Sequence, residues 1–144
     1  MAVDFSNVNF LPDSVNHSND NFNILEQWDI VSYMRVAYGF SDQARQMFDN
    51  WGNRPINVTF RRGKAEADPG TGNIFIDLNH IDELSYIDTN GKAQQYSRIG
   101  AVIHELGHAL TGRRDNITPT DYQGNNVRFI NQIWAEIQIG RAHV

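Results

Sequence analysis

Residues 97–112 read SRIGAVIHELGHALTG and carry the strongest structural signal in the chain. Ser97 is a favourable N-terminal cap, and Gly112 is a typical residue just beyond the end of a helix. Between them the larger apolar side chains recur at helical spacing on one face: Ile99, Val102, Ile103, Leu106 and Leu110. The pattern predicts an amphipathic helix to Thr111 whose apolar face packs into the core and whose opposite face opens into a cleft.

Two histidines stand on that opposite face. Residues four apart in a helix lie about 40° apart around its axis and one turn apart along it, so His104 and His108 project together. The chain has no cysteine, so any metal must be held by His, Asp or Glu. The spacing His-Glu-x-x-His is typical of a zinc site. We therefore expect His104 and His108 to bind one Zn²⁺.

Glu105 follows the first histidine and lies about 100° from it around the helix, beside the metal position rather than on it. Zinc lowers the pKa of a bound water to about 7, and a neighbouring carboxylate can accept the proton as that water attacks a carbonyl. Glu105 is thus the predicted general base. The chemistry predicted for the chain is zinc-dependent hydrolysis of peptide bonds in a peptide or protein substrate.

A catalytic zinc usually has three protein ligands and one open position. A longer form of this motif has glycine three residues and a third histidine six residues after the second histidine. This chain has Thr111 and Arg114 at those positions, so the third ligand must come from elsewhere. Glu136 on the predicted last helix fits a gluzincin-like layout, in which a glutamate comes from the helix packed behind the motif helix. The alternatives are Asp115 and Asp121, while His80 and His143 are interpreted as ordinary polar residues. Tyr96 and Tyr122 are the nearest candidates for a phenol that stabilises the oxyanion.

The rest of the sequence predicts one domain over residues 24–144, preceded by an irregular N-terminal arm over residues 1–23. A helix is expected over 24–38, with Gly39 as its stop signal and Trp28 in the core. Ser41 is expected to cap a second helix, whose buried face is Ala44, Met47, Phe48 and Trp51.

Beyond Pro55 the pattern becomes β-like. Residues 56–60 and 73–78 alternate apolar and polar side chains and predict a two-strand meander joined by the turn residues 68–72. A hairpin around residues 89–91 is expected to extend it, and the strand over 73–78 is expected to offer an edge to an extended peptide. A last helix is predicted over 125–139, which gives an α+β fold.

Composition excludes several classes of function. The net charge of −5 and the pI near 5.4 argue against a nucleic-acid-binding surface or an anionic-membrane surface. The 144 residues contain no apolar run long enough to span a membrane, and the N-terminus has no basic and apolar secretory signal. We expect a globular protein that is either cytoplasmic or exported without a classical signal peptide.

Residues 99–110 and 126–136 resemble the bacterial effector-type zinc metallopeptidases, the family of the type III secreted NleD protein. The resemblance covers about the last third of the chain. It implies a minimal zincin-like domain, in which a small sheet packs against the motif helix and a C-terminal helix, and an endopeptidase delivered out of a bacterial cell. Under this resemblance His104 and His108 are the zinc ligands and Glu105 is the base.

Two other readings stay open. One is a catalytically inactive zinc-binding or peptide-recognition domain with the same fold. The other is a protein-interaction domain in which the His-Glu-x-x-His spacing arose by chance and holds no metal. Glu105 favours catalysis, because a purely structural zinc site needs no base beside the metal.

Overall fold

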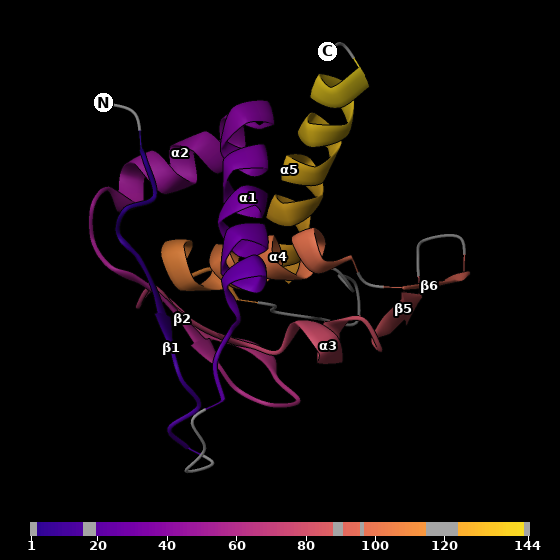
Figure 1. The fold of residues 1–144 in the computed structure, drawn as a ribbon. Helices are drawn as coiled ribbons and strands as arrows, with labels where there is room; N and C mark the ends of the chain where they lie inside the picture. The colour runs from indigo at the N-terminus through magenta and orange to yellow at the C-terminus, as the bar shows by residue number, and fades with distance from the viewer. Residues whose placement is uncertain (1–2, 16–19, 88–90, 96, 115–123, 143–144) are drawn as a thin grey trace.

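The computed structural model describes residues 3–15, 20–87, 91–95, 97–114 and 124–142. It confirms an α+β fold, with the four long helices gathered on one side of a four-stranded sheet (Figure 1). The elements in chain order are β1 (Val8–Leu11), α1 (Ile24–Phe40), α2 (Asp42–Trp51), β2 (Ile56–Phe60), β3 (Ala65–Asp68), β4 (Asn73–Ile76), α3 (Leu78–Ile81), β5 (Ser85–Ile87), β6 (Ala93–Gln95), α4 (Arg98–Thr111) and α5 (Gly124–Ala142).

The main sheet has the strand order β1-β2-β4-β3. β1 is parallel to β2 and β2 is parallel to β4, with Val8 opposite Ile56 and Val58 opposite Ile74. β3 runs antiparallel to β4 at the other edge. A parallel pair needs a long crossover, and α1 and α2 supply it between β1 and β2. The topology therefore places these helices over a face of the sheet.

The expectation of an irregular N-terminal arm was wrong, because residues 8–11 form the edge strand β1. The arm is also anchored by aromatic packing. Phe5 is buried edge-on against Phe48, and Phe22 is buried against Phe10 and Phe60. Residues 3–15 and 20–23 therefore belong to the folded domain.

The two-strand meander was also wrong. The predicted strands exist as β2 and β4, but β3 lies between them in sequence and pairs with β4 through the predicted turn at residues 68–72. β3 has the sequence Ala-Glu-Ala-Asp, whose residues have weak strand preference, so the sequence did not predict it. β4 is consequently an inner strand with both edges paired, and the free edge on that side of the sheet belongs to β3. The hairpin of β5 and β6 forms as predicted, but as a separate two-stranded sheet.

Helix α4 lies at the centre of the domain. It contacts β3 and β4 on the sheet side and α1, α2 and α5 on the helical side. Its caps are as predicted, because the Ser97 hydroxyl accepts from the Gly100 N–H and Gly112 takes the left-handed conformation with φ 72°. Burial extends beyond the predicted apolar face to Ala109 and to two small residues that flank the histidines, Ala101 and Gly107. The small side chains let neighbouring elements approach the helix closely.

Helix α2 agrees with the sequence-based prediction more closely than α1 does. α2 has the predicted cap, buried face and C-terminal glycine. α1 continues through Gly39 to Phe40, and its buried side is Ile30, Met34 and Ala37. Trp28 is 62% exposed, so its expected place in the core was wrong. In the described part of the chain, no helix has both the length and the apolar character needed to cross a bilayer.

Candidate metal centre

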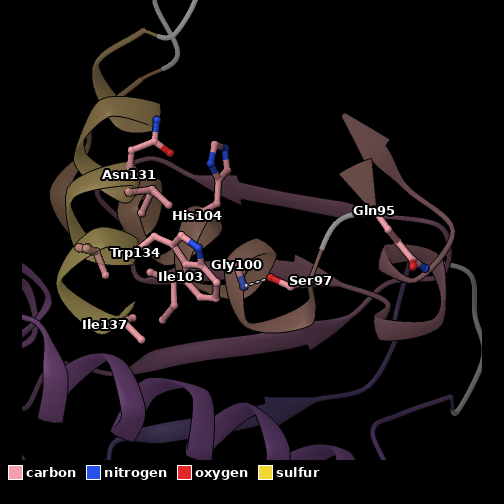
Figure 2. Close-up of a pocket in the computed structure, with 10 residues that line it drawn as sticks. Gln95, Ser97, Gly100, Ile103, His104, Asn131, Trp134 and Ile137 are labelled. Carbon is pink, nitrogen blue, oxygen red and sulfur yellow. Dashed lines mark hydrogen bonds between the residues drawn. The ribbon is translucent and has the colours of Figure 1, made fainter. Parts of the chain in front are cut away.

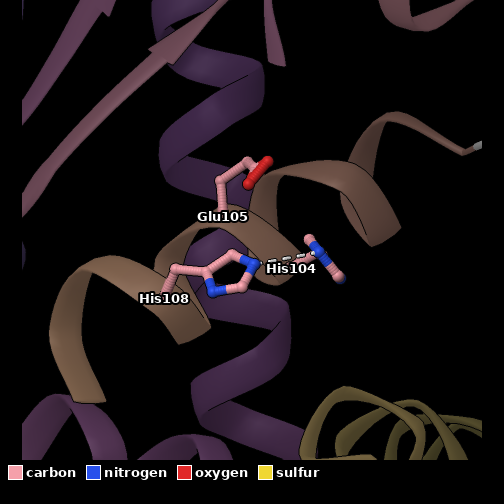
Figure 3. Close-up of side chains that lie close together, drawn as sticks. All are labelled: His104, Glu105 and His108. Carbon is pink, nitrogen blue, oxygen red and sulfur yellow. Dashed lines mark hydrogen bonds between the residues drawn. The ribbon is translucent and has the colours of Figure 1, made fainter. Parts of the chain in front are cut away.

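The two histidines of α4 face each other, each through its Nε2 atom (Figure 3). Their Nε2 atoms are 3.2 Å apart, and the two rings are nearly perpendicular, at 80°. Two imidazole nitrogens on a tetrahedral zinc, each about 2.05 Å from the metal, stand about 3.3 Å apart. The 3.2 Å spacing is that of a hydrogen bond between the two rings, as drawn in Figure 3, and it also fits two ligands on one zinc ion.

The tautomer of His108 is fixed by a neighbouring carbonyl group. Its Nδ1 lies 2.6 Å from the backbone oxygen of Arg113, in the short segment that follows α4. A carbonyl oxygen can only accept, so Nδ1 carries the hydrogen and donates it. Nε2, the atom that faces His104, is then the nitrogen left to bind a metal. Such a hydrogen bond behind the ligand nitrogen is typical of metal-bound histidines.

Glu105 lies beside this pair and is buried, with 6% of its surface exposed. One carboxylate oxygen and one nitrogen from each histidine all lie within 4.8 Å of one another. The two histidines are half-buried, so the centre opens to solvent on their side while the carboxylate is enclosed. A buried carboxylate therefore lies beside the two histidines, and its role as a general base stays a prediction.

The end of α4 that carries His108 is fastened to the sheet. The N–H groups of Gly70 and Gly72, in the turn between β3 and β4, donate to the carbonyls of His108 and Ala109 at 3.0 Å each. Gly72 has φ 76°, and a side chain there would meet the ring of Trp51. The turn therefore satisfies two helix-end carbonyls and fixes the helix relative to the edge strand β3.

Glu136 does not join the two histidines in this structure, contrary to the gluzincin-like expectation. Its carboxylate caps the N-terminus of α2 instead. Oε1 accepts from the Ser41 hydroxyl at 3.1 Å and from the Gln43 N–H at 3.4 Å, and Oε2 accepts from the Asp42 N–H at 3.1 Å. A carboxylate is favourable there because the first N–H groups of a helix lack partners within the helix.

Other predicted site residues are not brought to the centre or lie outside the described residues. His80 is in α3, where its N–H is bound by the Asp77 side chain, and it is not part of the group. Asp115, Asp121, His143, Tyr96 and Tyr122 lie outside the described residues. Among the residues that are described, the potential metal ligands at the centre are His104, Glu105 and His108. The aspartate alternatives for the third ligand stay predictions.

A cavity of about 340 Å³ adjoins the centre, and the sequence did not predict it. We call it the α4–α5 cavity, and its walls are Ile103 and His104 from α4 with Ile130, Ile133, Trp134 and Ile137 from α5. Figure 2 shows His104 and Asn131 at one end and Ile137 at the other. The clue in the sequence was the pair Ile130 and Trp134, four apart on α5, but both could equally have been covered by another element.

No protein-family model, curated protein or solved structure matches this chain. The resemblance to effector-type metallopeptidases, and the delivery out of a bacterial cell that it implies, therefore stay predictions from the sequence.

Proposed function

We propose that the protein is a zinc-dependent peptidase that cleaves internal bonds of peptide or protein substrates. The observation that carries the proposal is the 3.2 Å separation of the His104 and His108 Nε2 atoms, next to a buried carboxylate. Nδ1 of His108 donates to the Arg113 carbonyl, which leaves Nε2 as the nitrogen available to a metal. This donor set fits Zn²⁺, which favours nitrogen ligands in tetrahedral geometry.

The roles of the residues follow from their positions. His104 and His108 hold the metal, and zinc, when bound, supplies a Lewis acid that polarises a carbonyl and acidifies a coordinated water. Glu105 accepts the proton of the attacking water and returns it to the amine that leaves. Its burial keeps the carboxylate close to the reacting atoms and away from bulk solvent.

The edge strand β3 offers a way to align an extended substrate. β3 packs against α4, and its turn to β4 is hydrogen-bonded to the His108 end of that helix. The sheet edge on that side belongs to β3, so its backbone groups can pair with a peptide laid along the strand. In the proposal, β3 takes the role that the sequence had assigned to residues 73–78.

Metal content tests the first part of the proposal. Purified protein, stripped with a chelator and reconstituted with zinc, is expected to hold about one zinc per chain by elemental analysis. His104→Ala and His108→Ala are each expected to lose it, because each removes a ligand. His80→Ala is the matched control, since this half-buried histidine lies in α3 outside the centre, and it should keep the metal. Zinc absent from the reconstituted parent, or retained by both α4 variants, overturns the proposal.

The second candidate function is a domain that binds zinc and a peptide without cleaving it. It is favoured by one observation, because Glu105 lies close enough to both histidines to act as a ligand itself. A screen of zinc-loaded protein against a mixed peptide library distinguishes the two by mass spectrometry. Catalysis predicts products that disappear when a chelator is added. A zinc-loaded protein that cleaves nothing, and in which Glu105→Gln loses the metal, supports the binding domain.

A further inference from the structure

The α4–α5 cavity and the metal centre share a wall. His104 contributes to the centre through Nε2, and its side chain also lines the cavity. Asn131 of α5 lies at the same end, is exposed, and offers an amide to a polar group held there (Figure 2). A substrate that presents a carbonyl beside His104 therefore has a neighbouring side chain within reach of the cavity.

The chemistry of the cavity walls restricts what can enter. Five of the residues on the two helices are Ile103, Ile130, Ile133, Trp134 and Ile137, and three of these are almost fully buried. Three further lining residues are polar but carry no charge, namely Gln95, Ser97 and Asn131. In the described part of the chain, no Asp, Glu, Lys or Arg lines this cavity. A charged side chain placed against these apolar walls would lose part of its hydration without gaining a partner of opposite charge.

Size favours a large occupant. A volume of about 340 Å³ lies at the low end of the range for small-ligand pockets. This is enough room for a benzyl, indole or branched aliphatic side chain, and a methyl group would leave most of it unfilled. Water held against isoleucine and tryptophan walls is released when an apolar group enters.

We propose that the α4–α5 cavity is the specificity pocket of the enzyme and binds a large uncharged apolar side chain adjacent to the scissile bond. This inference rests on the proposed peptidase function. The cavity lies on one side of His104. The substrate residue whose side chain enters it should therefore always be on the same side of the scissile bond. Burial of a Leu- or Phe-sized side chain predicts a preference over glycine of about 10- to 100-fold in kcat/KM.

The first test is cleavage of matched peptides that differ at one position next to the scissile bond, carrying Phe, Leu, Gly or Lys. Zinc-loaded parent protein is expected to prefer Phe and Leu. Ile130→Asp puts a carboxylate into the wall and should lower the Phe preference at least 10-fold while improving cleavage of the Lys peptide. Ile139→Asp is the matched control, since this residue is on the same helix, is 62% exposed and does not line the cavity, and its preference should stay that of the parent.

The second test measures binding without catalysis. The Glu105→Gln variant is titrated with N-acetyl-L-phenylalanine amide while the Trp134 indole N–H is followed by NMR, with Trp134→Phe used to assign the signal. A shift is expected with this amide but not with N-acetylglycine amide or N-acetyl-L-lysine amide. Adding Ile130→Asp should abolish the shift, and adding Ile139→Asp should leave it.

The two tests separate the failure of the pocket from the failure of the peptidase. Cleavage with no side-chain preference, or equal shifts with all three amides, overturns the pocket while the peptidase stands. A protein that cleaves no peptide refutes the peptidase, and the Trp134 titration then decides by itself whether the cavity selects apolar side chains.

Discussion

Replacing Glu136 distinguishes a structural carboxylate from a metal ligand. Its two oxygens accept from the Ser41 hydroxyl and from the N–H groups of Asp42 and Gln43, at 3.1 to 3.4 Å. Hydrogen bonds to a charged group contribute about 1.5–3 kcal/mol, and a carboxylate at a helix N-terminus up to about 2 kcal/mol. The two ranges are estimates of the same interaction and are not added, so Glu136→Ala should lower the free energy of unfolding by about 2 kcal/mol. Glu136→Gln, which keeps an oxygen acceptor, should lower it by about 1 kcal/mol.

Thermal unfolding and zinc titration together give the assay. For a chain of this length, 1 kcal/mol corresponds to about 4 °C, so the Tm should fall by about 8 °C for Glu136→Ala and about 4 °C for Glu136→Gln. Zinc affinity should remain that of the parent. Glu83→Ala is the control because Glu83 is exposed, and it should change the stability by less than about 0.5 kcal/mol. A Glu136→Gln protein with an unchanged Tm and a tenfold weaker affinity for zinc would refute the reasoning and restore Glu136 as a ligand.

Two further predictions concern the surroundings of α4. Gly72→Ala should destabilise the protein by about 3 kcal/mol in chemical denaturation, because the added Cβ would clash with the Trp51 ring at a position with positive φ. Gly63→Ala is the control, since Gly63 has a similar φ but open space around it, and it should cost only about 1–2 kcal/mol. Equal losses of stability in the two variants would contradict the steric explanation. Hydrogen bonds from Arg98 lower the pKa of Asp82, so this pair stabilises the fold above the unfolded pKa of about 3.9 and ceases to do so as the pH falls through the lower folded pKa. Asp82→Asn should therefore cost about 0.5 kcal/mol or less at pH 7, since the pair is partly exposed. The cost should shrink as the pH falls below the unfolded pKa, and a cost that grows toward low pH would show that the sign is wrong.

Features that depend on local chemistry could be predicted from the sequence. The ends of α2 and α4 follow from Ser41, Ser97, Gly52 and Gly112, because a cap acts on N–H and C=O groups within one turn. The juxtaposition of His104 and His108 follows from helix geometry alone. The turn at residues 68–72 likewise forms where its Pro and Gly residues predict it.

Features that depend on distant partners could not be predicted. Glu136 lies at the edge of the apolar face of α5, and helical spacing alone does not decide whether it faces the metal centre or the N-terminus of α2. β3 becomes a strand because β4 offers it an edge, despite the low strand preference of Ala-Glu-Ala-Asp. Trp28 matched the helical repeat of α1, yet the elements that pack on α1 bury Ile30 and Met34 instead.

The central claim is that Glu105 moves the proton while the histidines hold the metal, and one measurement tests it most directly. It is the rate of peptide hydrolysis by Glu105→Gln relative to the parent, at equal zinc content. Glutamine keeps the size of the buried side chain but removes its basicity, so the rate should fall by about 100-fold or more, with zinc stoichiometry and Tm near those of the parent. A variant that retains the full rate, or one that loses zinc as completely as His104→Ala and His108→Ala, contradicts the claim.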